Sequence, residues 1–534
     1  MQDESVSLLE LSKKYQDRYA QPIVGARVAG EICSLNRHIK SDEQVEFLDL
    51  TSAEGFQIYQ RSLCFVMIKA ARDLFPAAPM IIKYSLGEGI YCEWDLEQEL
   101  TQTELSQLET RMRMIIEADI PFIDQVIDKE DAIEIFKAQN AQDKVFRLRY
   151  DPVQRIKVYS LAGYYDYFYG CLAPSTGFLG DFGLVLYPPG LLLYMPAVHG
   201  GRPEQPISYN KISAVLQEAD NWGKYLGSLY IADLNSHVQD GSMHEILWLA
   251  EALHEKRIVQ MAELISSQRD KLRLILIAGP TSSGKTTFAK RLMIHLRVNG
   301  LKPVAISLDD YFLPRELTPK NGEDDYDFES INALDLVLFN ANLQSLLAGE
   351  KVQLPRYNFQ TGKRETGNQV QVGLDQPVII EGIHGLNEHL TASIERTKKF
   401  KIYISALARI GLDYHSTVST TDTRMLRRIV RDNQFRNYRA EQTIQIWPSV
   451  RLGEQLNIFP FQEEADIVFN SALLYEWSVL RSVAEPLLKE IGSDSKAYAE
   501  AQRLLNLLSY FQPMDMELVP RNSILREFVG GSFL

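Results

Sequence analysis

The chain is poor in cysteine, contains no long hydrophobic run and has no excess of positive charge. It has four cysteines among 534 residues, and their spacing fits neither a disulfide framework nor a zinc site. No apolar run reaches the roughly 18 residues that span a membrane. The start, MQDESVSLLELSKK, lacks the basic-then-apolar order of a signal peptide. We therefore expect a cytoplasmic protein with no membrane partner.

The charge is distributed unevenly along the chain. The formal net charge is −14, and residues 1–270 account for all of it, with 25 Lys and Arg against 39 Asp and Glu. The remaining residues are balanced, with 31 of each sign. This distribution excludes a uniformly basic nucleic-acid binder, and we do not expect nucleic acid as a partner.

The second half alternates short apolar segments with longer helical patterns. This alternation predicts an α/β domain with a parallel sheet and helices on both faces. The expected strands are 274–278 (LILIA), 304–308 (VAISL), 378–380 (VII) and 401–404 (KIYI). Before them, Ser242 and Glu245 form an S-x-x-E capping box that predicts a helix over 243–267. This helix either connects two domains or is an integral part of one.

Residues 279–287, GPTSSGKTT, fit the phosphate-binding loop pattern G-x-x-x-x-G-K-[ST] between an expected strand and an expected helix. Such a loop turns its N–H groups toward phosphate, and the following helix adds partial positive charge. We expect Lys285 to reach the β- and γ-phosphates of ATP and the Thr286 hydroxyl to bind Mg²⁺. The predicted ATP-binding residues are Gly279, Pro280, Thr281, Ser282, Ser283, Gly284, Lys285, Thr286 and Thr287.

Carboxylates follow two of the other expected strands. Asp309 and Asp310 follow 304–308, and Glu381 follows 378–380. Because ligands lie at the carboxyl ends of parallel strands, one of the aspartates is placed to accept a proton from a hydroxyl, or else merely caps a turn. For Glu381 we expect a role in holding Mg²⁺ or its water.

Arginines are concentrated further along the chain, where six fall within 16 residues. They are Arg424, Arg427, Arg428, Arg431, Arg436 and Arg439. Their fork-shaped side chains suit a transferring phosphoryl group, although a solvated basic face or an RNA-binding patch has the same composition. The aromatic residues around Tyr326–Phe328 and Tyr357–Phe359 fit either base stacking or a hydrophobic core.

Residues 274–480 resemble the uridine kinase and phosphoribulokinase family. The matching segments are GPTSSGKTT, SLDDYF, DDYDFES, LPRYNF, VIIEGI and DTRMLRRIVRD, in the order and spacing of the family. The resemblance implies that Asp309 is the base for a sugar 5′-hydroxyl and that 428–440 is a lid bearing Arg428 and Arg431. It places Glu329, Tyr357, Phe359, Arg424 and Arg436 at the acceptor. The chain departs from the family at Gly362, where a base-contacting His is usual, and at Glu329, where an Asp is usual.

The front half also resembles known modules. Residues 8–50 are similar to the ubiquitin-like TGS module, and residues 56–225 to the second additional domain of threonyl-tRNA synthetase, through RSLCFVMIKAARDLFP, GIYCEWDLEQELT and APSTG. That domain edits mischarged tRNA with an HxxxH pair and a Cys-x-x-x-His pair. Here the four positions are Arg61, Phe65, Phe168 and Leu172, so the resemblance implies an editing fold without its chemistry. A tyrosine-rich stretch over 164–169 is either packing or a new ligand surface.

These observations define four expected domains: a TGS-like module (1–52), a synthetase-like domain (53–241), a connecting helix (242–270) and a P-loop kinase domain (271–534). The function that we expect is ATP- and Mg²⁺-dependent phosphorylation of a nucleoside-like hydroxyl acceptor. The alternative is a nucleotide-dependent regulatory ATPase that binds RNA or protein, while residual editing has neither a base nor a nucleophile. The acceptor's identity and assembly into a homo-oligomer are left open.

Overall fold

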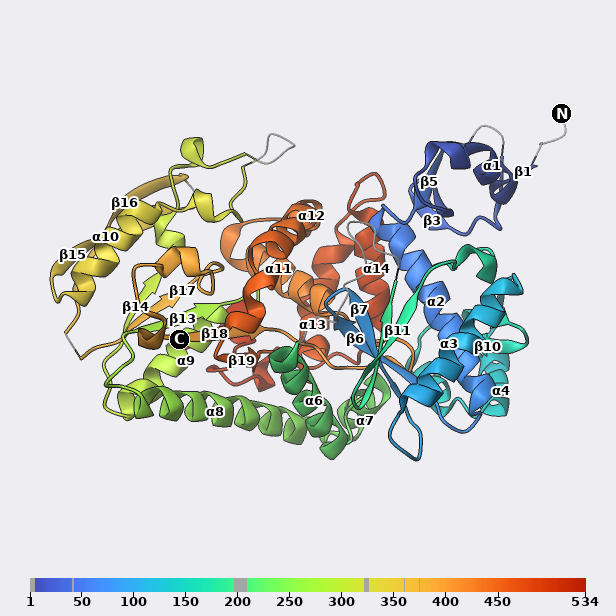
Figure 1. Cartoon of the computed structure of the whole chain (residues 1–534), viewed down its shortest axis with the longest axis horizontal. Helices are drawn as coiled ribbons and strands as arrows, with labels where there is room; N and C mark the ends of the chain where they lie inside the picture. The colour runs from blue at the N-terminus through green and yellow to red at the C-terminus, as the bar shows by residue number, and fades with distance from the viewer. Residues whose placement is uncertain (1–4, 41–42, 196–208, 321–325, 360, 374) are drawn as a thin grey trace. The chain divides into compact units, whose positions relative to one another are not determined.

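The structure is a computed structural model that describes every residue except 1–4, 41–42, 196–208, 321–325, 360 and 374 (Figure 1). Two compact units are present. Unit 1 consists of residues 1–209, 229–233 and 409–418, and unit 2 of residues 210–228, 234–408 and 419–534. Both units are discontinuous in sequence, so the chain passes repeatedly from one to the other. The four domain limits given above stay a prediction.

Unit 1 begins with a small α+β module. Strand β2 lies between β3 and β5 in an antiparallel sheet, and β1 pairs with β4. Helix α1 is capped by the Ser7 hydroxyl and packs Leu8 into the core of this module. The elements are β1 (Ser5–Ser7), α1 (Leu8–Tyr15), β2 (Ile23–Val28), β3 (Glu31–Cys33), β4 (His38–Lys40) and β5 (Val45–Asp49).

The rest of unit 1 is built around helix α2 (Ala53–Leu74), most of whose side chains are buried. An antiparallel sheet of order β11-β12-β7-β6 and a second of order β10-β9-β8 belong to this part. The strands are β6 (Met80–Leu86), β7 (Gly89–Trp94), β8 (Ile123–Asp128), β9 (Arg155–Leu161), β10 (Tyr164–Asp166), β11 (Gly183–Tyr187) and β12 (Gly190–Tyr194). The helices are α3 (Gln102–Glu117), α4 (Lys129–Ala138) and α5 (Gln142–Tyr150). The α+β character expected of the front half is confirmed.

Unit 2 contains a parallel five-stranded sheet of order β14-β17-β13-β18-β19. Its central strand has the sequence LILIA and is buried on both faces, which is why it reads as a continuous apolar run. The strands are β13 (Leu274–Ala278), β14 (Val304–Ser307), β17 (Val378–Glu381), β18 (Lys399–Ser405) and β19 (Ile467–Asn470). The four strands predicted from sequence are thus confirmed, together with the P-loop α/β fold class. A hairpin of β15 (Lys351–Asn358) and β16 (Lys363–Gln371) lies outside this sheet.

Helices make up much of the rest of unit 2. Helix α9 packs on β13 and β17, and the long helix α8 packs along α9 (Figure 1). The helices are α6 (Asn210–Tyr225), α7 (Ile231–Asp240, which begins in unit 1), α8 (Met243–Ser267), α9 (Lys285–Val298), α10 (Leu336–Leu347), α11 (Thr420–Arg436), α12 (Ala440–Asn457), α13 (Glu476–Lys489), α14 (Tyr498–Ser509) and α15 (Arg526–Val529). In the part of the chain that the structure describes, no helix combines the length and the apolar character that crossing a membrane requires.

Helix α8 has the predicted limits but not the predicted cap. The Ser242 side chain makes no capping hydrogen bond to the helix. Its hydroxyl donates instead to Asp240 Oδ1 (2.5 Å) and lies 2.6 Å from His237 Nδ1. The S-x-x-E pattern therefore located the start of the helix correctly, although nearby polar partners compete for the serine.

Candidate active site at the carboxyl edge of the parallel sheet

The phosphate-binding loop joins β13 to α9, as its sequence predicts. Gly284 has φ +86°, a left-handed conformation that favours glycine, and a Cβ on Gly279 would lie 2.0 Å from the Ile404 carbonyl oxygen. Lys285 Nζ donates to the carbonyl oxygens of Gly279 (3.0 Å) and Pro280 (3.1 Å). Its ammonium group is therefore held over the loop, where phosphate oxygens can replace these carbonyls.

Two hydroxyl groups of the loop are buried without a hydrogen-bond partner. They belong to Ser282 and Ser283, which are 3% and 0% exposed. A buried hydroxyl is normally paired, because leaving it unpaired costs free energy. These orphaned groups fit a loop that completes its hydrogen bonds with a ligand such as ATP.

The predicted carboxylates reach the same edge of the sheet. In the register of β17, Glu381 lies opposite Ile277 of β13 and Ser307 of β14. The Thr286 hydroxyl donates to Glu381 Oε1 at 3.4 Å. Asp309 lies two residues after the end of β14, and its backbone N–H donates to the Ser307 hydroxyl. The structure thus brings Asp309 and Glu381 to the edge at which Lys285 and Thr286 begin α9.

The oxygen donors at this edge suit a hard cation. Thr286 and Glu381 offer a hydroxyl and a carboxylate, and Mg²⁺ characteristically binds one or two protein oxygens plus water and phosphate oxygens. Within the described residues, no cluster of three or more His, Cys, Asp or Glu side chains could hold a metal. The Thr286 hydroxyl and the Glu381 carboxylate fit Mg²⁺ that arrives with a nucleotide.

Two carboxyl groups of the site have strongly raised pKa values. Burial, reinforced by the neighbouring charge of Glu454, raises the pKa of Glu329 to about 7. Burial also raises the pKa of Glu381 to about 7, although the positive charge of Lys285 opposes the shift. Perturbed carboxyl groups beside cations are typical of functional sites.

The arginines of α11 fall into two groups. Arg424 and Arg427 are buried and pair with Glu454 and Glu476. The other group, Arg428, Arg431 and Arg436, shares the carboxylate of Asp432.

Arg424 is a buried residue that supports the phosphate-binding loop at Thr281. Its guanidinium donates to Glu454 and to the Thr281 carbonyl oxygen (3.2 Å), and Glu454 Oε1 accepts from the Thr281 N–H (3.1 Å). With 1% exposure it is closed off from an acceptor, so its position gives no support to the binding role predicted for it. Arg428 is less buried than Arg424, with a side chain that is 12% exposed, and one of its NH groups donates to the Thr281 hydroxyl at 3.3 Å.

The residues expected at the acceptor occupy different environments. Phe359 is 53% exposed, and the Arg436 guanidinium lies 5.9 Å from its ring centroid. Tyr357 is 4% exposed and packs against Phe312 in the core. Glu329 lies against α12, where a Cβ on Gly453 would be 2.3 Å from the Glu329 Cβ. Phe359 and Arg436 are therefore the more accessible pair.

The structure explains why a glycine, and not the histidine expected from the family resemblance, stands at position 362. Gly362 has φ +67°, and a Cβ there would lie 3.0 Å from Arg315 Nε. Its carbonyl accepts from the Arg315 N–H, and the Arg315 guanidinium donates to the Phe359 carbonyl oxygen. A histidine at this position would be strained, so the acceptor side of this site is built differently from the family pattern.

Two glutamates of the site were not predicted from the sequence. Glu454 and Glu527 both accept backbone N–H groups of the phosphate-binding region, at Thr281 and Thr287. They lie 173 and 240 residues from these partners, and neither belongs to a motif. No sequence signal could have located them.

The part of the chain that contains this site matches a known protein family. Residues 274–474 match the model of the Phosphoribulokinase / Uridine kinase family. These residues therefore form a domain of that family, and the match covers less than half of the chain.

The front half is similar to part of a different enzyme. A "Threonine--tRNA ligase" of Desulforamulus reducens is 31% identical over 180 residues, which is 34% of this chain and 28% of the ligase. A "Threonine--tRNA ligase" of Carboxydothermus hydrogenoformans is 26% identical over 278 residues, covering 51% of this chain and 43% of the ligase. The chain thus spans less than half the length of these curated relatives.

Solved structures of kinases match more distantly. One described as "a Possible Uridine Kinase from Bacillus stearothermophilus" is 19% identical and covers 40% of this chain and 98% of its own, with a TM-score of 0.29. D-glycerate 3-kinase from Cryptococcus neoformans var. grubii is 16% identical and covers 47% and 87%, with a TM-score of 0.21.

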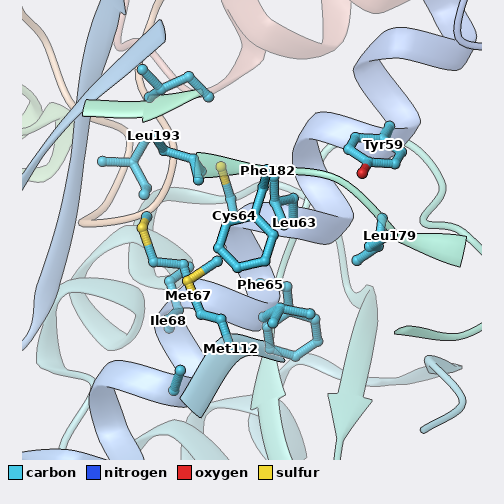
Figure 2. Close-up of a cluster of buried hydrophobic side chains, with 14 of the residues drawn as sticks. Tyr59, Leu63, Cys64, Phe65, Met67, Ile68, Met112, Leu179, Phe182 and Leu193 are labelled. Carbon is cyan, nitrogen blue, oxygen red and sulfur yellow. The ribbon is translucent and has the colours of Figure 1, made fainter. Parts of the chain in front are cut away.

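Three of the four positions that the resemblance is expected to match with editing residues are filled by buried apolar side chains. Phe65 and Phe168 are buried with ring centroids 5.1 Å apart, and Leu172 is 1% exposed. Figure 2 shows Phe65 and its neighbour Cys64 among the apolar side chains of this core. Burial raises the pKa of Cys64 to about 12, so no thiolate forms there at neutral pH. At the fourth position, the N–H groups of the Arg61 guanidinium donate hydrogen bonds to the Cys171 carbonyl oxygen. These four positions thus hold neither a base nor a nucleophile.

Proposed function

We propose that the chain is an ATP-dependent kinase that transfers the γ-phosphoryl group to a hydroxyl of a nucleoside-like acceptor. The observation that carries the proposal is the convergence of Lys285, Thr286, Asp309 and Glu381 at one edge of the parallel sheet. The match to a kinase family over 274–474 supports a small-molecule kinase. The nucleoside-like acceptor, the cytoplasmic location and the roles of single residues are parts of this proposal.

In this proposal the chain's side chains position the reactants and balance their charge. Asp309 takes the proton of the acceptor hydroxyl while the new oxygen–phosphorus bond forms and the bond to the β,γ-bridging oxygen breaks. Lys285, Arg428 and Arg431 hold the phosphoryl oxygens, and Thr286 and Glu381 hold Mg²⁺ or its water. The bound Mg²⁺ supplies neutralisation of the negative charge on the phosphates.

The acceptor side supports a ring-shaped substrate but not a standard uridine site. Phe359 offers an exposed face beside Arg436, and the raised pKa of Glu329 lets its carboxyl group donate or accept a hydrogen bond near neutral pH. Gly362 and Arg315 replace the histidine contact of the family. We therefore propose a nucleoside-like acceptor whose base is not recognised by that histidine.

A substrate screen with purified full-length protein tests the kinase. ATP, Mg²⁺ and a panel of nucleosides and other hydroxyl compounds are incubated with the enzyme, and ADP release is measured. We expect one class of acceptor to stimulate ADP release, and Asp309→Asn to lower kcat by about 100-fold or more while the Kd for ATP is unchanged.

The matched control is Asp375→Asn, which removes an exposed carboxylate of the same unit and should leave kcat unchanged. If no acceptor stimulates turnover and Asp309→Asn behaves like this control, the kinase proposal is wrong. A regulatory ATPase then becomes the better description.

A further inference from the structure

The last residues of the chain pack directly on the phosphate-binding loop. The Ile524 side chain covers Gly284, because a Cβ on that glycine would lie 2.4 Å from Ile524 Cγ2. The Arg427 guanidinium lies 4.9 Å from the Phe528 ring centroid, and one of its NH groups is 3.4 Å from the Ser282 carbonyl oxygen. These contacts join the C-terminal segment, residues 516–531, to the same loop that is proposed to bind ATP.

The C-terminal segment is an ordered structure with its own internal bonds. The Arg526 guanidinium donates to the carbonyl oxygens of Val519 (2.7 Å), Met516 (3.0 Å) and Gly530 (3.3 Å). Ser523 and Tyr475 lie 3.3 Å apart through their hydroxyl oxygens. The segment therefore presents its side chains to the loop in a fixed arrangement.

One of these side chains occupies an anion position. Glu527 Oε2 accepts the backbone N–H of Thr287 at 2.9 Å. Thr287 lies in the first turn of α9, and the N–H groups of such a loop and helix start cradle the α- and β-phosphates of a nucleotide. A carboxylate and a phosphate oxygen cannot both accept this one hydrogen bond without strong like-charge repulsion.

Glu527 is held without a direct ion pair. Across the described residues, no basic side chain forms an ion pair with Glu527, and the residue is neither fully buried nor exposed. The hydrogen bond to Thr287 and the positive end of α9 are what hold the charge in place.

We propose that Glu527 is an internal competitor of the nucleotide, which holds the phosphate-binding loop closed until ATP displaces the C-terminal segment. The inference rests on the proposed function, because it takes the loop to be the ATP site. A protein whose competent state is a fraction of the population binds its ligand more weakly by that fraction. Glu527 thus sets the ATP concentration at which the enzyme becomes active.

The test compares nucleotide binding by the full-length wild type and Glu527→Gln. Glutamine keeps the size of the side chain and the packing of Ile524 and Phe528, but it lacks the charge that competes with phosphate. Calorimetry with a non-hydrolysable ATP analogue and Mg²⁺ should give a Kd about 10-fold lower for Glu527→Gln, as expected when a neutral amide oxygen, which holds the Thr287 N–H more weakly, replaces a charged acceptor. Adenosine, which carries no phosphate, should bind both proteins equally. Glu517→Gln, an exposed glutamate of the same segment, is the matched control and should bind like the wild type.

Hydrogen exchange gives a second measurement. In the wild type, the ATP analogue should speed exchange of the amides in 523–530, because the segment leaves the loop.

The outcomes separate the two proposals. If the wild type binds ATP and the Kd of Glu527→Gln is unchanged or higher, the proposal that Glu527 competes with the nucleotide is wrong. The kinase proposal is unaffected by that result. Tighter binding of adenosine by the same factor also overturns it, because the effect would then not depend on phosphate. Absence of ATP binding in both proteins overturns the proposed function and this inference with it.

Discussion

Glu454 illustrates how single buried charges determine the shape of this site. It is fully buried, pairs with Arg424 and Arg451, and also accepts the Thr281 N–H of the phosphate-binding loop. Its charge contributes to the raised pKa of Glu329. Glu454 belongs to no motif, yet it connects the phosphate-binding loop, helix α11 with its arginines and the acceptor side of the site.

Glu454→Gln should destabilise unit 2 by about 3–5 kcal/mol, because it leaves the buried guanidinium of Arg424 without a counter-charge. Urea unfolding measures this loss of stability, and hydrogen exchange of peptides from α11 and α12 shows whether these helices are the ones affected. Glu490→Gln, at an exposed position of the same unit, is the matched control and should change stability by less than about 0.5 kcal/mol. Equal stability of the two variants would show that the Arg424–Glu454 pair does not hold the loop.

Helix α8 supports the site at the scale of an element. It packs on α9, whose first turn forms part of the phosphate-binding loop. His254 of α8 is 5% exposed, and its Nε2 lies 3.2 Å from the Ala472 carbonyl oxygen. Burial, with a contribution from the charge of Arg291, lowers the pKa of His254 to about 3.

This low pKa predicts a loss of stability in mild acid. The unfolded chain takes up a proton at His254 below about pH 6.5, whereas the folded chain does not until pH is near 3, so the free energy of unfolding falls as pH falls through this window. Between pH 7.5 and pH 5.5 the loss from this one group is about 1.4 kcal/mol. Urea unfolding at the two pH values should show a smaller difference for His254→Gln than for the wild type. His244→Gln, at an exposed position of α8, should retain the wild-type difference. An unchanged pH dependence in His254→Gln would refute the assignment.

At the scale of the whole molecule, the two sequence resemblances do not coincide with the two compact units. Residues 409–418 lie inside the span that matches the kinase family, yet they belong to unit 1. There Asp413 pairs with Arg147 and lies 3.6 Å from Lys144, while His415 lies 2.6 Å from Asp166. A short segment just before the arginine helix α11 is thereby part of the synthetase-like core.

Asp413→Asn should therefore destabilise unit 1, although the change lies in the kinase-family sequence. We expect a loss of about 3–5 kcal/mol, because Arg147 and Lys144 lose a buried counter-charge. Hydrogen exchange of peptides within 142–170 measures it. Asp128→Asn, which removes a carboxylate that is 70% exposed on β8, is the control and should have little effect. Unchanged protection of these peptides in Asp413→Asn would show that the segment is not part of the core of unit 1.

The ionisation of Asp413 also determines the pH below which its stabilisation of unit 1 is lost. Burial alone would raise its pKa, but Lys144 and Arg147 outweigh that effect, so the pKa of Asp413 lies well below the ordinary value of 3.8. The stabilisation is therefore complete above about pH 4 and is lost as the pH falls further.

What the sequence could predict follows from how local each feature is. The strand LILIA, the loop 279–287 and the carboxylates at the ends of β14 and β17 are set by short patterns, and the structure has them where they were expected. The hydrogen bonds of Thr281 to Glu454 and of Thr287 to Glu527, and the placement of residues 409–418 in unit 1, depend on contacts between distant residues. A single sequence has no periodicity that reports such contacts, so Glu454, Glu527 and Asp413 could not be assigned.

Direct transfer of the γ-phosphoryl group is the measurement that tests the central claim most directly. ATP labelled in its γ-phosphoryl group is incubated with full-length protein and the acceptor panel, and the label is followed into products. We predict that label appears in a phosphorylated hydroxyl compound and that Asp309→Asn removes this product without weakening ATP binding. Label found only in inorganic phosphate, at the same rate with every acceptor and in Asp309→Asn, would contradict the account.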